Sequence, residues 1–256
     1  MIESFQQRDR IWITIVLVAT VALCGAWIVA MARDMYGPMT GASAWMMTDN
    51  WNLSHLLLLF AMWVVMMAGM MLPSVAPALF TYARMVRPEP ADRGVAAKVH
   101  AFAGGYLAVW AGFSFLVTVV QRLLARGLLL SPMMEVRDAR LSGVLFLIAG
   151  LYQFTPAKYT CLQSCQLSSR FISLHGQNGK AGSFRLGIAS GLRCVGCCWA
   201  AMMLLFVGGV MNLWWIAGLT VFVCFEKAGA LDRRGTQIVG LCLVAAGIWH
   251  LSRGLF

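Results

Sequence analysis

Long apolar runs separated by short polar segments recur along the whole chain. They lie at residues 11–32, 53–80, 101–121, 141–157, 186–208, 211–226 and 236–252. About 20 apolar residues in a helix cross the hydrocarbon core of a bilayer. The pattern therefore predicts an all-α fold, a polytopic transmembrane helical bundle of about seven spanning helices. The fourth run is short and only residues 208–212 separate the fifth from the sixth, so six to eight spans fit the same pattern.

Composition leaves no room for a soluble domain. Hydrophobic residues make up 60% of the 256 residues and charged residues 12%, and no long polar stretch interrupts the apolar runs. Residues 1–256 are therefore expected to form a single transmembrane helical domain. The first run is too long for a typical signal-peptide core, and residues 31–34 make a poor cleavage site, so it is interpreted as a spanning helix.

The net charge of +10 lies in the short segments between the apolar runs. Lys and Arg in such segments set the orientation of a membrane protein and contact anionic lipid headgroups, so nucleic acid is not expected as a partner. With seven spans, most of these residues fall on the side of the N-terminus. The positive-inside rule then predicts a multi-pass protein of the bacterial inner (plasma) membrane, with a cytoplasmic N-terminus and an outer C-terminus.

Two clusters of cysteine carry the candidate chemistry. Cys161 and Cys165 are four residues apart, and Cys194, Cys197 and Cys198 share one helical turn, so each set presents its thiols on one helix face. The predicted topology brings both sets to the cytoplasmic side. Thiolates and thioethers favour soft metals, and copper as Cu(I) is preferred here over zinc because two or three sulfurs satisfy it. Cys24, Cys224 and Cys242 stand alone and are interpreted as packing residues.

Methionine and glutamate extend the candidate site. Met66 and Met70 lie four residues apart in the second run, just before Pro73 and Pro77, which are expected to bend or interrupt that helix. Glu226 ends the sixth run, where a carboxylate requires a partner or water; it is either paired with Lys227 or part of the metal site. The candidate metal ligands are therefore Cys161, Cys165, Cys194, Cys197, Cys198, Met66, Met70 and Glu226.

Other residues add less. The methionine pairs Met46–Met47 and Met133–Met134 fall on the predicted outer side, where thioethers suit capture of Cu(I). No nucleophile triad, phosphate-binding loop or carboxylate pair is visible, so the sequence does not predict an enzyme.

Together, four segments resemble a known family. They are residues 66–74 with Pro77, residues 152–158 with the Cys161 pair, residues 194–199 with Met202, and Glu226 with Lys227. Over roughly 55–230, they resemble the bacterial family of predicted metal-binding integral membrane proteins, a family of unknown function. The resemblance implies a metal site without naming the metal. In that family, His or Arg and then Pro commonly follow the first cysteine pair, whereas Gln166 and Leu167 follow it here.

Three functions are consistent with these observations. The first is a metal-binding membrane protein that transports, delivers or inserts Cu(I), with a metal donor or acceptor protein as its partner. The second is a thiol-redox electron carrier, and the third is a structural subunit of a larger membrane complex. The first is preferred because the clustered thiols are predicted on the reducing side of the membrane, where disulfides seldom persist.

Overall fold

The computed structural model describes residues 2–35, 37, 52–86, 95–131, 134–166 and 179–254, without the side chains of residues 2–10 and 166. These residues form helices joined by turns, with one isolated bridge between Leu130 and Val136. The fold is all-α, as predicted. In chain order the helices are α1 (Ile2–Met35), α3 (Leu53–Met85), α4 (Val95–Arg126), α5 (Ala139–Tyr152), α6 (Pro156–Gln166), α8 (Gly179–Met203), α9 (Leu205–Gly208), α10 (Leu213–Lys227) and α11 (Arg233–Arg253).

Within the described ranges, five segments are helical, long and apolar enough to cross a membrane. They are Ile11–Met35, Leu53–Met85, Val95–Arg126, Gly179–Gly208 and Arg233–Arg253. The predicted count of seven is not confirmed, because α5 has 14 residues and α10 has 15. At 1.5 Å per residue these helices are about 21–23 Å long, which is shorter than the hydrocarbon core of roughly 30 Å.

The predicted fourth span ends early for a local reason. Asp138 caps the start of α5 by accepting a hydrogen bond from the Arg140 amide, and α5 ends at Tyr152. Pro156 then occupies the first position of α6, where its missing N–H leaves no hydrogen bond unmade. The run at 141–157 is therefore divided into two short helices, and α6 carries the first cysteine pair.

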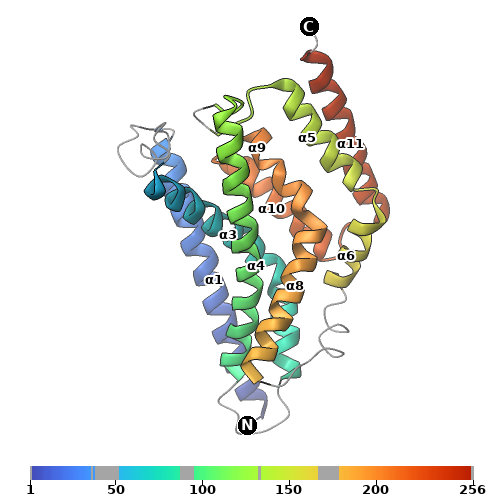
Figure 1. Cartoon of the computed structure of the whole chain (residues 1–256). Coiled ribbons are helices and arrows are strands. Elements are labelled where there is room, and N and C mark those ends of the chain that lie inside the picture. The colour runs from blue at the N-terminus through green and yellow to red at the C-terminus, as the bar shows by residue number, and fades with distance from the viewer. Residues whose placement is uncertain are drawn as a thin grey trace.

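The helices run back and forth, so that α1 begins at one end of the bundle and α11 ends at the other (Figure 1). α4 packs along α8, and α5 packs along α11. Glycines permit the first contact: a Cβ on Gly105 would lie 2.1 Å from the Phe184 carbonyl oxygen, and a Cβ on Gly187 would lie 2.0 Å from that of Phe102. Only glycine therefore allows the α4 and α8 backbones to approach this closely.

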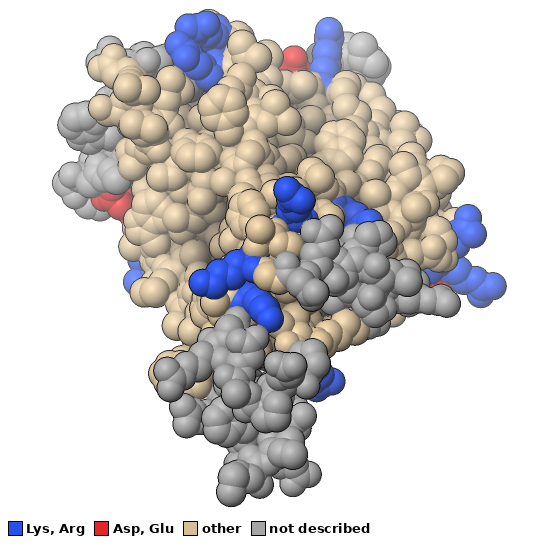
Figure 2. All heavy atoms as spheres, turned by 60° about the horizontal axis from the view of Figure 1, so that its bottom comes forward, with Lys and Arg blue, Asp and Glu red and all other residues tan. Residues whose placement is uncertain are grey.

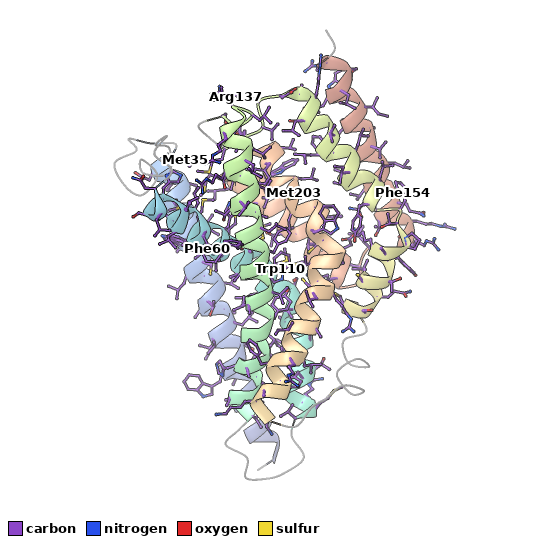
Figure 3. All side chains as sticks on the ribbon, viewed as in Figure 1. Met35, Phe60, Trp110, Arg137, Phe154 and Met203 are labelled. Carbon is purple, nitrogen blue, oxygen red and sulfur yellow. The ribbon has the colours of Figure 1, made fainter. Side chains whose placement is uncertain are left out.

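Large side chains fill the interior between the helices (Figure 3). Trp110 is nearly fully buried, and Trp63 donates a hydrogen bond of 2.6 Å from Nε1 to Oε1 of Gln121. By contrast, the most apolar stretch of α1 has no buried residue. The core that positions the site is therefore built by α3, α4 and α8, and α1 lies against α3 at the side.

α3 is one continuous helix through Pro73 and Pro77, so these prolines do not interrupt it, and the alternative that they bend the helix stays a prediction. Each proline removes one backbone N–H donor, but neither ends the helix. Both prolines line an internal cavity instead, which is where helical proline is tolerated within a membrane protein.

Basic residues mark the end of the bundle where α1 begins. α3 ends there with Arg84, and α4 and α8 begin there close to Lys98 and Lys180. Figure 2 shows Lys and Arg side chains on the face formed by this end, beside residues that are not described. A multi-pass membrane protein fits these features, and the orientation stays a prediction. Met46, Met47 and Met133 lie outside the described residues.

Candidate copper site

A cavity of about 420 Å³ lies among α3, α4, α6, α8 and α10. Its wall combines thiols, hydroxyls, one ammonium group and the proline-containing face of α3. The polar and sulfur-bearing residues that line it include Ser74, Tyr106, Cys165, Cys194, Cys224 and Lys227. The cavity therefore receives polar and sulfur-bearing side chains from five helices within an otherwise apolar bundle.

Cys194 lies among polar side chains in this cavity. Its Sγ lies 2.7 Å from Nζ of Lys227 and 2.9 Å from Oη of Tyr106. Ammonium and phenol groups both donate hydrogen bonds, and a thiolate accepts them. The surroundings of Cys194 thus offer two hydrogen-bond donors to a thiolate, which is the form that binds metal.

Lys227 joins α10 to α3 as well as to α8. Its Nζ donates to Oγ of Ser74 at 2.9 Å and lies 3.8 Å from Sδ of Met71. The Met71 carbonyl accepts a hydrogen bond of 2.8 Å from Ser74 Oγ. One cationic group therefore contacts a thiol sulfur, a thioether sulfur and a hydroxyl oxygen at the same place.

The other two cysteines of the cluster turn back onto their own helix. Cys197 and Cys198 are buried, and their Sγ atoms donate to the Cys194 carbonyl oxygen at 3.1 and 2.9 Å. Their thiols therefore point back toward the backbone of Cys194, and neither residue lines the cavity.

α6 brings the first cysteine pair against α8. Cys165 lines the cavity, whereas the Cys161 sulfur lies where a side chain on Gly196 would begin, since a Cβ there would be 2.9 Å from it. Tyr152, at the end of α5, donates a hydrogen bond to the Gly196 carbonyl. Burial raises the pKa of the Cys161 thiol, and the nearby Cys197 raises it further while Arg193 lowers it. The protonated thiol is thus the favoured form of Cys161 at neutral pH.

Glu226 forms a buried ion pair with Lys158, a residue of α6. Its Oε1 lies 2.5 Å from Nζ of Lys158, and the two residues are 1% and 2% exposed. Lys158 also donates to the side-chain carbonyl of Gln153. The carboxylate at the end of α10 is thus matched by a cation from α6, and the Lys227 ammonium lies among the side chains that line the cavity.

The structure brings some of the predicted site residues together. Cys165 and Cys194 share the cavity, and Cys161 lies beside Gly196 next to the cluster. Met66 and Met70 lie on α3 and are buried in the core of the bundle. A role for them as ligands stays a prediction. Among the described residues, no three His, Cys, Asp or Glu side chains converge to hold one metal ion.

Several residues of the site escaped prediction. Cys224 was interpreted as packing but lines the cavity. Met71 follows the predicted Met70 by one residue, and the sequence gives no reason to choose between them. Tyr106 lies in a run with no unusual polar pattern, so only the packing of α4 on α8 could reveal it. Lys227 could have been identified from the sequence, because a lysine at the end of an apolar run indicates a functional site in a membrane protein.

The depth of the site also differs from the prediction. The apolar run that contains the cysteine cluster was predicted to begin at residue 186, with the cluster on the cytoplasmic side. α8 instead begins at Gly179, so Cys194 comes 15 residues later, about 22 Å along the helix. The segment before the cluster is rich in Gly and Ser and contains Lys180, Arg185 and Arg193, which lower its apparent hydrophobicity. Of these small residues, Gly187 and Gly191 lie against α4.

The fold and the cavity define a class: a multi-pass helical membrane protein with an interior sulfur-bearing site. Comparison with known families identifies the family, since the model described as "PpoB2: Copper chaperone" matches residues 60–250. The chain belongs to this copper chaperone family. No curated protein and no solved structure gives a significant match.

Membership in this family confirms the preferred function from the sequence analysis. The protein is a soft-metal-handling protein and not an enzyme, and copper is its implied cargo. The matched residues include the cavity and the cysteine cluster, whereas α1 lies before the match.

Proposed function

We propose that the chain holds Cu(I) in the cavity beside α8, with Cys194 and Met71 as its two sulfur ligands, and hands it to an acceptor protein. The observation that carries the proposal is the position of the Lys227 ammonium. This one cation lies 2.7 Å from the Cys194 sulfur and 3.8 Å from the Met71 sulfur. A thiolate and a thioether around one point suit Cu(I) better than a hard cation.

Delivery is favoured over conduction by the description of the family as copper chaperones. Transfer between proteins requires ligands that exchange one at a time. Cys165 and Cys224 stand on the same cavity wall and offer such intermediate thiols. In this proposal Cys161, Cys197 and Cys198 form a further reserve of sulfur close to the cavity, and Glu226 acts indirectly by engaging Lys158.

The test is the copper content of the detergent-purified full chain after loading with Cu(I) under reducing conditions. We expect about one copper per chain in the native protein and loss of that copper in Cys194→Ser. Cys242→Ser is the matched control, because Cys242 is exposed on α11. This variant should retain the copper. Equal copper in the Cys194 and Cys242 variants would exclude Cys194 as the thiolate ligand.

A second comparison separates the methionines. Met71→Leu should weaken Cu(I) binding by about tenfold, equivalent to about 1.4 kcal/mol, because a thioether is replaced by an apolar group of similar volume. Met66→Leu and Met70→Leu should leave the affinity unchanged. Competition with a Cu(I) chelator measures all three. If the Met66 or Met70 variant binds Cu(I) more weakly and Met71→Leu does not, the thioether ligand is that methionine and not Met71.

A further inference from the structure

The Lys227 ammonium is surrounded by atoms that are also suited to a soft monovalent metal ion. Its Nζ contacts Cys194 Sγ, Ser74 Oγ and Met71 Sδ at 2.7, 2.9 and 3.8 Å. A lysine that only anchored a helix end would extend to water or to a lipid headgroup. Here the side chain turns into the cavity and lies against the Cys194 sulfur.

Charge balance explains why an ammonium group is suited to this place. A thiolate at Cys194 leaves one negative charge within a mostly apolar bundle, and an unpaired buried charge is costly. Lys227 neutralises it with one positive charge, and Tyr106 adds a contact at 2.9 Å. Cu(I) also carries one positive charge, so replacement of the ammonium by Cu(I) leaves the charge at the two sulfurs unchanged.

We infer that Lys227 is a tethered cation that occupies the copper position in the copper-free protein and makes the site select Cu(I) over Zn(II). This inference rests on the proposed copper site at Cys194 and Met71. On loading, the hydrogen bonds from Lys227 to Cys194 and Ser74 break and Cu–S bonds form to Cys194 and Met71. The lysine keeps its proton and swings away; no electron is transferred.

The position of Lys227 allows this movement. It is the last residue of α10, and Gly229 follows in a left-handed conformation with a φ of 73°. A long side chain at a helix end has more freedom to change rotamer than one in the middle of a packed helix. The displaced ammonium stays close by, where it repels a divalent ion about twice as strongly as a monovalent one.

Metal selectivity tests the inference. Competition with chelators at one pH gives the dissociation constants of Cu(I) and Zn(II) for the native chain, Lys227→Gln and Lys227→Arg. For each protein, the ratio of the Cu(I) and Zn(II) dissociation constants measures the preference for Cu(I). The free energy of deprotonating Cys194 is the same for both metals and therefore cancels in this ratio. We expect Lys227→Gln to lower the preference for Cu(I) by on the order of tenfold or more. Lys227→Arg keeps the charge and should keep the preference.

An unchanged ratio in Lys227→Gln would overturn the selectivity role. A second measurement uses the native protein and needs no variant: mass spectrometry after brief reaction with an amine-acylating reagent. Lys227 should be protected without copper and acylated after one Cu(I) per chain is bound. Lys158, buried against Glu226, is the internal control and should stay unmodified in both states.

The two proposals fail in different ways. Retention of copper by Cys194→Ser would reject the copper site itself. Copper binding that depends on Cys194, together with a Lys227 that stays protected after loading, would reject only the tethered-cation role.

Discussion

At the residue scale, neighbouring residues of this site have different contacts and therefore different roles. Cys194 contacts an ammonium and a phenol, whereas Cys197 and Cys198, in the same turn, donate to a backbone carbonyl. The adjacent pair Glu226 and Lys227 divides in the same way, with one residue in an ion pair and the other among sulfurs. The contacts of Cys194, Glu226 and Lys227 depend on partners from other helices, whereas those of Cys197 and Cys198 stay within α8.

The Lys158–Glu226 pair leads to a stability prediction at this scale. Lys158→Met should lower the free energy of unfolding by about 3 kcal/mol, because it leaves a buried carboxylate without its cation. The double variant Lys158→Met/Glu226→Leu should recover most of that loss. Thermal unfolding in detergent measures both. A double variant no more stable than the single one would show that the pair acts by more than mutual neutralisation.

At the element scale, small residues decide which helices meet. Gly105 and Gly187 bring the backbones of α4 and α8 together, and this contact places Tyr106 beside Cys194. Gly143 and Gly247 do the same between α5 and α11, where a Cβ on Gly143 would be 2.9 Å from the Gly247 carbonyl. The site is therefore held by backbone contacts that tolerate no added atom.

Gly187→Ala tests this dependence. Its Cβ would overlap the Phe102 carbonyl, so we expect a loss of about 3 kcal/mol in stability and weaker Cu(I) binding as α8 moves away from α4. Gly112→Ala on α4 is the control, because a Cβ there meets nothing within 4 Å and alanine favours the helix. Thermal unfolding of the two variants should differ clearly; equal unfolding temperatures would contradict the close-packing argument.

At the scale of the whole molecule, the ends of the chain fall on opposite sides of the bundle, while the cavity lies deep between them. α1 begins at the basic end and α11 ends at the far end (Figure 1). Met71, Tyr106 and Cys194 each lie well inside a long helix.

The arrangement predicts the outcome of topology mapping. Alkaline phosphatase, which is active only outside the cytoplasm, should be active when fused after residue 256 and inactive when fused within residues 87–94. The physical reason is the basic end of the bundle, which the positive-inside rule retains in the cytoplasm. Activity in both fusions or in neither would contradict the placement of residues 87–94 and residue 256 on opposite sides of the membrane. Activity only in the fusion within residues 87–94 would show that the orientation is inverted.

The sequence by itself determined the class of protein, the helical fold and the chemistry. Apolar runs of spanning length leave few alternatives to a membrane bundle, because lipid offers no partner for backbone groups. The spacing of Cys194, Cys197 and Cys198 indicated soft-metal chemistry, since helical periodicity places such residues on one face. These inferences depend on local composition and period, which a sequence displays directly.

Only the tertiary structure decided which residues share the cavity and how deep it lies. Met71 rather than Met70 faces Lys227, Tyr106 reaches Cys194 from α4, and Lys158 engages Glu226 from α6. Each of these contacts joins residues far apart in the chain. Their existence depends on the rotation and close approach of packed helices, which glycine contacts set and which no single apolar run contains.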